Sequence, residues 1–175
     1  MSRPITQCRS NRRTRSYDEQ SNDLLALLAC GLVATGRPGD AGTPLLWNWS
    51  YSGAGISASG TITTGDTATA AGRFLITGIT GSRNGVAIVG LQPTGTPIPG
   101  NAPYVVDNEV GADEPQLSGA GFGFALADGT FANPFFADDR SPKTCLEFFS
   151  GAGVPGRDNS ERPIDFTASA SERRP

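Results

Sequence analysis

The chain has 175 residues and a net charge of −3, because 17 acidic side chains outnumber 14 basic ones. This length suits a single domain. The 23 glycines, the 13 prolines and the charged fraction of only 18% are typical of a turn-rich all-β protein rather than a helical bundle. No histidine is present, which excludes Ser-His-Asp and Cys-His catalysis within one chain.

Residues 1–44 are predicted to be an export-signal-like or disordered segment that ends in a linker. The run LLALLACGLVAT at residues 24–35 is too short to cross a bilayer and suits the apolar part of a signal peptide. We therefore expect cleavage near residues 36–44 and a secreted or cell-surface protein, with no transmembrane span. Two alternatives stay open: an amphipathic helix packed on the domain, or lipidation of Cys30 within a loose lipobox.

The apolar residues that follow alternate with polar ones, as they do in half-buried strands. Trp47, Trp49 and Tyr51 fall on every second residue, so their rings share one face of a strand. Buried rings would form the core, whereas exposed rings would be candidate ligand-binding residues that stack on a sugar. Asn84-Gly85 and Asp128-Gly129 each predict a tight hairpin turn, because their positions favour positive φ.

The segment after Leu91, QPTGTPIPGNAP, predicts a long loop, which is a common location for binding residues. Beyond it we expect short strands at Tyr104–Val106, around Phe122 to Leu126, at Phe131–Phe136, around Cys145 to Ser150 and around Ile164 to Ala168. Glu147 is expected to point outward from its strand, although a carboxylate among apolar neighbours is also typical of glycosidase sites.

An acidic segment follows the predicted strand at Tyr104–Val106. Carboxylate oxygens are ligands that calcium prefers, so four side chains are candidate metal ligands: Asp107, Glu109, Asp113 and Glu114. Their spacing does not match an EF-hand loop, and a solvated acidic loop is the alternative. We expect no cofactor other than this calcium. Because Cys145 would be the only cysteine left after cleavage, we expect no disulfide framework.

Eight to ten short strands with glycine turns predict an antiparallel β-sandwich or jelly roll over residues 45–170, followed by a disordered tail at 171–175. A flattened barrel is the alternative. The 12 acidic and 6 basic residues of this domain give it a net charge of about −6, which disfavours nucleic acid as a partner. The edge strands of an open sandwich can pair between chains, so the oligomeric state stays open.

Several segments of the sequence resemble those of a known group of proteins. These are FLITGITGSRNGVAIVGL, the upstream pattern W-x-Y-S-G-x-G-x-x-A-S-G-T and the downstream GFGFALADGTFANPFF and LEFFS. They resemble uncharacterised bacterial exported proteins, many of which end in a PEP-CTERM sorting tail. The resemblance implies export and a β-rich fold, and it implies no catalytic residues. The sequence SASERRP at residues 169–175 lacks the Val-Pro-Glu-Pro motif of such a tail.

These observations predict a non-catalytic, exported structural or adhesive module at the cell surface or in the extracellular matrix. One alternative is a carbohydrate-binding module that uses exposed aromatic rings. A second alternative is a carboxylate-based glycosidase or lyase. The expected partners are a polysaccharide or other surface proteins.

Overall fold

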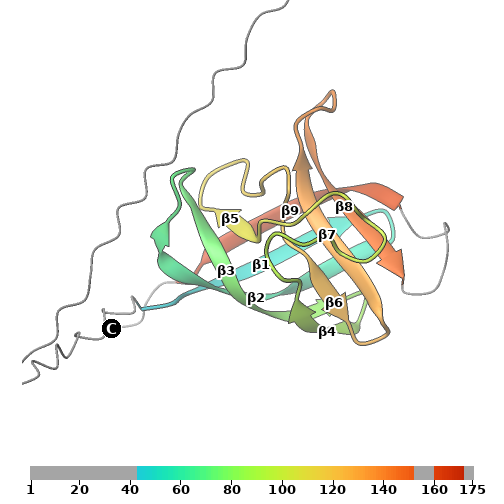
Figure 1. The fold of residues 1–175 in the computed structure, drawn as a ribbon, viewed down its shortest axis with the longest axis horizontal. Helices are drawn as coiled ribbons and strands as arrows, with labels where there is room; N and C mark the ends of the chain where they lie inside the picture. The colour runs from blue at the N-terminus through green and yellow to red at the C-terminus, as the bar shows by residue number, and fades with distance from the viewer. Residues whose placement is uncertain (1–42, 152–159, 172–175) are drawn as a thin grey trace, which may run out of the picture. The chain divides into compact units, whose positions relative to one another are not determined.

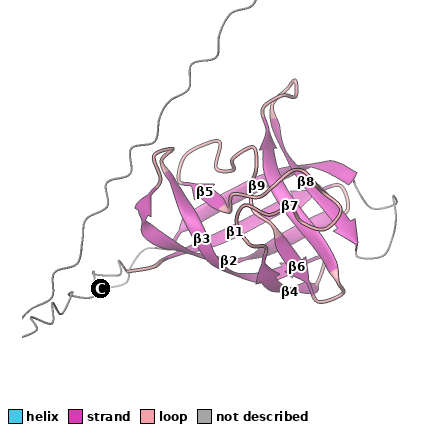
Figure 2. Cartoon of the chain, in the orientation of Figure 1, coloured by secondary structure: helices cyan, strands magenta, loops and turns pink. Residues whose placement is uncertain are grey.

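The computed structural model describes residues 43–151 and 160–171, and these residues form nine β-strands and no helix (Figure 2). The expected export segment, the linker and most of the tail lie outside the described residues. The strands are β1 (Leu45–Gly53), β2 (Ile56–Ala68), β3 (Arg73–Arg83), β4 (Val86–Leu91), β5 (Glu109–Gly111), β6 (Phe124–Leu126), β7 (Thr130–Ala137), β8 (Thr144–Gly151) and β9 (Ser160–Ala170).

The strands form a closed antiparallel barrel rather than an open sandwich or jelly roll, so the predicted architecture is wrong, although the all-β class is confirmed. The hydrogen-bonded order runs β2-β1-β9-β8-β7-β6-β4-β3, and the pairing of β2 with β3 closes the ring (Figure 1). β5 is an extra strand that pairs with one end of β3. Closure removes the free edges that two separate sheets would keep.

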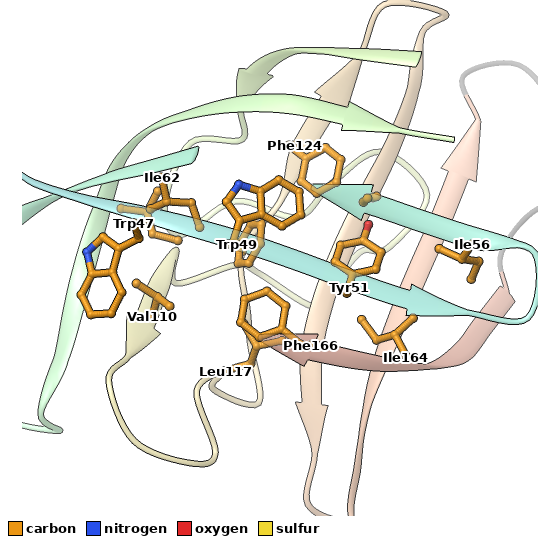
Figure 3. Packing of buried hydrophobic residues seen from close by; sticks show 14 of the residues in the cluster. Trp47, Trp49, Tyr51, Ile56, Ile62, Val110, Leu117, Phe124, Ile164 and Phe166 are labelled. Atoms are coloured by element: carbon orange, nitrogen blue, oxygen red, sulfur yellow. The ribbon is translucent and has the colours of Figure 1, made fainter. Parts of the chain in front are cut away.

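The interior of the barrel is filled by side chains, as expected for eight strands. Trp47, Trp49 and Tyr51 all point inward, and each is only 2% exposed. Trp49 contacts Phe122 edge-on at a centroid distance of 5.7 Å. It also lies 6.0 Å from the centroid of Phe124 (Figure 3). The alternation of aromatic and polar residues therefore marks a buried face, and the outward positions of β1 are small polar side chains.

Two glycines face each other across β2 and β3 on the inward side of the barrel, in register with Trp49. Gly60 pairs with Trp49 on one side and with Gly81 on the other. A Cβ at Gly60 would overlap the carbonyl oxygen of Thr80, and one at Gly81 would overlap that of Ser59. Gly81 also has a φ of 135°, which side chains rarely adopt. The glycines therefore permit the close approach of the β2 and β3 backbones beside the indole.

Both predicted hairpin turns are confirmed. Asn84 and Gly85 have φ values of 47° and 82° and connect β3 to β4, while Gly129 has a φ of 83° between β6 and β7. Asn84 also fixes this turn to the neighbouring β1–β2 turn. Its side chain accepts a hydrogen bond from the Ser57 amide at 2.8 Å and donates one to the Gly55 carbonyl at 3.0 Å.

The predicted loop after Leu91 continues to residue 108 and crosses the outer face of β7 and β8 (Figure 1). The expected strand at Tyr104–Val106 is wrong, because these residues belong to the loop. Val106 and Ile98 turn inward from the loop and pack on Phe148 of β8, forming a small second core outside the barrel. The loop is therefore anchored by its own apolar residues. The apolar run Tyr104–Val106 resembles a strand in the sequence because it contains one of these anchors, Val106.

Candidate functional site

The aromatic residues suggested for sugar stacking do not form a surface. Trp47 and Trp49 belong to the barrel core, and the Trp47 indole donates a hydrogen bond to the buried Thr64 hydroxyl at 3.0 Å. Tyr51 lies in the same core. The three rings therefore form part of the core, which was one of the two interpretations of the sequence. A sugar on the outside of the barrel does not reach them.

The four acidic residues suggested for calcium do not converge. Asp107 and Glu109 are half-buried, whereas Asp113 and Glu114 are exposed. Asp107 accepts the backbone N–H of Glu109 at 3.2 Å, which is a local turn contact. Within residues 43–151 and 160–171, no three acidic or cysteine side chains gather closely enough to hold a metal ion. The geometry gives the calcium hypothesis no support.

Glu147 points into the barrel and is 1% exposed, so the expectation of an outward side chain is wrong. Its Oε2 accepts hydrogen bonds from the Tyr51 hydroxyl at 2.5 Å and from Arg83 Nε at 2.8 Å. Its Oε1 accepts from Arg83 Nη2 at 2.5 Å. The Arg83 guanidinium also lies over the Phe149 ring, 3.8 Å from its centroid.

The contacts of Glu147 favour the protonated forms of Tyr51 and Arg83. Burial, followed by the charge and hydrogen bond of Glu147, raises the pKa of Tyr51 well above its usual range. Burial alone would lower the pKa of Arg83, but the hydrogen bonds and charge of Glu147 outweigh it and raise that pKa. Because both oxygens of Glu147 are occupied and shielded from solvent, the network fits a structural plug for one end of the barrel better than a reaction centre.

The described surface has a cleft of about 590 Å³ beside Tyr104, which we call the Tyr104 cleft. One wall is the loop of residues 92–108, which we call the covering loop. The floor is the outer face of β7, and the far end is the β7–β8 turn. Its lining residues are Asn101, Tyr104, Val105, Gly119, Ala120, Asn133, Phe135, Phe136, Ala137, Asp138, Asp139, Arg140 and Glu161. It combines an apolar floor with a polar rim, as small-molecule sites usually do.

Tyr104 is the most exposed large apolar or aromatic side chain among the described residues, at 71%. Its backbone N–H is bonded to the Asn101 carbonyl at 2.9 Å, so the ring stands on a fixed turn. The Asn101 side chain in turn approaches the buried Asn133, with 3.4 Å between amide nitrogen and oxygen. Asn133 donates to the carbonyls of Ala120 and Phe122 at 3.1 Å each, which joins the cleft wall to its floor.

Asn108 secures the other end of the covering loop. It is fully buried with a φ of 54°, a conformation that asparagine tolerates better than most residues. Its amide donates to the Gln92 carbonyl at 2.7 Å and accepts the Gly123 N–H at 3.1 Å. The two ends of the loop are thereby clamped to each other and to the segment before β6.

The charged rim of the cleft is predominantly acidic. Arg140 Nη2 pairs with Glu161 Oε2 at 2.5 Å, and Arg140 Nε lies 4.0 Å from Asp139 Oδ1. Three carboxylates and one guanidinium line the cleft, so its lining carries a net charge of −2. The only cation of the lining is already engaged by two of the three carboxylates, which leaves Asp138 as the remaining acidic group.

A second, shallower hollow lies on the outer face of β1, β2 and β9. It is lined largely by small polar side chains, including Ser50, Thr61 and Thr167. These groups bond to their neighbours: Ser50 lies 3.2 Å from the Thr167 hydroxyl, and Thr61 lies 2.6 Å from that of Thr80. With no exposed aromatic ring and three of its hydroxyls bonded to neighbours, this face is the weaker binding candidate.

Comparisons of the chain with family models, curated proteins and solved structures give no match. A search of the described segments for a helix that is long and apolar enough to cross a membrane also finds none. The function is therefore inferred from the residues of the Tyr104 cleft.

Sequence reasoning located part of this cleft without identifying it. The proline- and glycine-rich stretch after Leu91 correctly indicated a long loop of the kind that carries binding residues. Tyr104 was missed because three successive apolar residues, Tyr104 to Val106, look like a strand. The residues Asp138 to Pro142 read as a turn from the sequence, but nothing in the sequence shows that this turn lies near Tyr104.

Proposed function

We propose that this protein is a non-catalytic, exported β-barrel module that binds carbohydrate in the Tyr104 cleft and acts as an adhesive or structural element outside the cell. The observation that carries this proposal is the exposed Tyr104 ring, which stands on a rigid turn beside a cleft with amide and carboxylate groups. Export and surface location rest on the signal-like sequence and on the resemblance described above.

Carbohydrates present two kinds of surface that this cleft complements. The C–H faces of a sugar ring are apolar and pack against aromatic rings, while its hydroxyls need hydrogen-bonding partners. Tyr104 and the half-buried Phe135 supply aromatic area. Asn101 and Asp138 supply an amide and a carboxylate on the rim. An open cleft between a loop and a hairpin also admits a chain rather than a single enclosed sugar.

The test is calorimetric titration of the 175-residue chain with three hexasaccharides of different charge: cellohexaose, the glucosamine hexamer and hexagalacturonate. We expect at least one to bind, and Tyr104→Ala to weaken that binding roughly tenfold or more, as truncation of a central aromatic anchor usually does. Val89→Ala is the matched control, because Val89 is 64% exposed and does not line the cleft.

Unchanged affinity in Tyr104→Ala, or no binding of any hexasaccharide, would contradict a carbohydrate site in this cleft. Shortening of the oligosaccharides during incubation would contradict the non-catalytic part of the proposal. Protein retaining Met1 and confined to the cytoplasm would contradict export.

A further inference from the structure

The charge of the Tyr104 cleft restricts what kind of carbohydrate fits it. Asp138 and Asp139 of the β7–β8 turn and Glu161 at the start of β9 all line the cleft, together with residues of the covering loop. Arg140 pairs with Glu161 at 2.5 Å and lies 4.0 Å from Asp139, so these carboxylates offset its positive charge. Among the described residues, the neighbouring cations Lys143 and Arg162 do not line the cleft.

We propose that the preferred occupant of the Tyr104 cleft is a carbohydrate chain that carries protonated amino groups, of the glucosamine type, and that acidic polysaccharides are excluded. This inference rests on the proposed carbohydrate function and adds its charge selectivity. An ammonium group on a sugar would pair with the Asp138 carboxylate, while the ring face would pack on Tyr104. A uronic acid at the same place would meet the net charge of −2 and find no unengaged cation among the lining residues.

The wider surface has the same sign. The described residues include 11 acidic and 5 basic side chains, a net charge of −6. A polycationic chain is therefore attracted before it docks, and a polyanionic chain is repelled. A neutral chain lacks the ionic contribution and depends on stacking and hydroxyl contacts alone. This predicts an order of affinity in which the amino sugar comes first, the neutral sugar second and the acidic sugar last.

The same three hexasaccharides test this order at low ionic strength. We expect the glucosamine hexamer to bind about tenfold more tightly than cellohexaose, an advantage that shrinks at 0.5 M salt because screening weakens exposed ion pairs. Asp138→Asn is expected to weaken only the glucosamine hexamer, by roughly threefold to tenfold. Asp66→Asn is the matched control, because it removes the same charge from an exposed residue that does not line the cleft.

Glu161→Gln gives a second, opposite readout. Loss of this carboxylate releases Arg140 from its 2.5 Å contact and makes the rim less acidic. We expect weaker binding of the glucosamine hexamer and stronger binding of hexagalacturonate than in the unaltered protein. Both positions are exposed turn or strand-end residues, so the variants are expected to fold normally.

The outcomes separate this inference from the function on which it rests. Equal binding of cellohexaose and the glucosamine hexamer, with the dependence on Tyr104 intact, would overturn the amine preference and leave the carbohydrate site standing. Preferential binding of hexagalacturonate would overturn it likewise. Failure of all three to bind would overturn both.

Discussion

Tyr51 donates its phenolic hydrogen bond to Glu147, a residue 96 positions further along the chain, across the inside of the barrel. The two strands are not neighbours in the sheet, because β9 lies between β1 and β8. Arg83 joins the same carboxylate from β3. One carboxylate therefore ties together three strands that backbone pairing alone does not connect directly.

The first prediction concerns this network. Glu147→Gln leaves the Arg83 charge buried without its carboxylate, and we expect a loss of about 3–5 kcal/mol in the free energy of unfolding, measured by urea denaturation at pH 7. The control is Glu161→Gln, which breaks an exposed ion pair and should cost no more than about 1 kcal/mol. Similar, small losses in both variants would contradict the assignment of the network as a structural plug.

A triple variant tests whether apolar side chains can replace the whole network. Tyr51→Phe, Arg83→Met and Glu147→Leu together replace every polar member by an apolar one of similar size. Because no charge is then left unpaired, we expect most of the stability lost in Glu147→Gln to return. A triple variant less stable than Glu147→Gln would show that apolar packing cannot substitute at this end of the barrel.

The second prediction concerns the glycine pair beside Trp49. In Gly81→Ala the new methyl group meets the Ser59 carbonyl at a φ that side chains rarely adopt. We expect a loss of about 1–3 kcal/mol or more in the free energy of unfolding. Gly65→Ala is the control, since a Cβ there meets nothing within 4 Å. Equal stability of the two variants would mean that β2 and β3 do not approach each other this closely.

The third prediction concerns the clamp at Asn108. Asn108→Ala leaves the Gly123 N–H and the Gln92 carbonyl without their partner, which costs about 1–3 kcal/mol per buried group. We expect faster amide hydrogen exchange through residues 92–108 and weaker glycan binding, because Tyr104 stands on this loop. Asn48→Ala, at an exposed amide on the outer face of β1 that does not line the cleft, should change neither. Unaltered exchange in the loop would contradict the clamp.

The fourth prediction concerns alkaline pH. Burial, with smaller contributions from the charges of Glu114 and Asp165, raises the pKa of the Cys145 thiol from 9.0 to about 11. The folded state therefore holds this proton more tightly than the unfolded state does. The resulting stability is fully present below pH 9 and is lost as the pH rises through 11.

Cys145→Ala isolates this contribution. Denaturant unfolding followed from pH 8 to pH 11 should show a shallower decline in the variant than in the unaltered protein. The raised pKa of Tyr51 acts in the same direction at higher pH in both proteins, so the difference between them reports on the thiol. Parallel declines would contradict a raised pKa of the half-buried Cys145 thiol.

Short-range signals in the sequence predicted short-range structure well. The alternation of Trp47, Trp49 and Tyr51 identified an inward face, and Asn84-Gly85 identified a hairpin, because both depend only on strand geometry and backbone φ. The choice between sandwich and barrel depends on whether β2 pairs with β3 along its length as well as with β1. That pairing brings the backbones at Gly60 and Gly81 so close that a Cβ would overlap the opposite strand, which strand patterns do not reveal.

The misplaced Glu147 and the missed Tyr104 have a common physical cause. An isolated carboxylate on a strand normally faces water, and only the Arg83 and Tyr51 partners, distant in sequence, make its burial tolerable. Tyr104 has an apolar neighbourhood in sequence but is exposed, because Val106 and Ile98 rather than Tyr104 anchor the loop. Both positions are decided by contacts between residues that lie far apart in the sequence.

The most direct test of the central claim is a map of backbone amide chemical shifts during titration of the glucosamine hexamer into the isotope-labelled chain. The proposal predicts that the shifts concentrate at the residues that line the cleft, namely 101, 104–105, 119–120, 133, 135–140 and 161, while the polar outer face of β1, β2 and β9 stays unperturbed. Shifts centred on that outer face, or no shifts with any of the three hexasaccharides, would contradict a carbohydrate site at Tyr104.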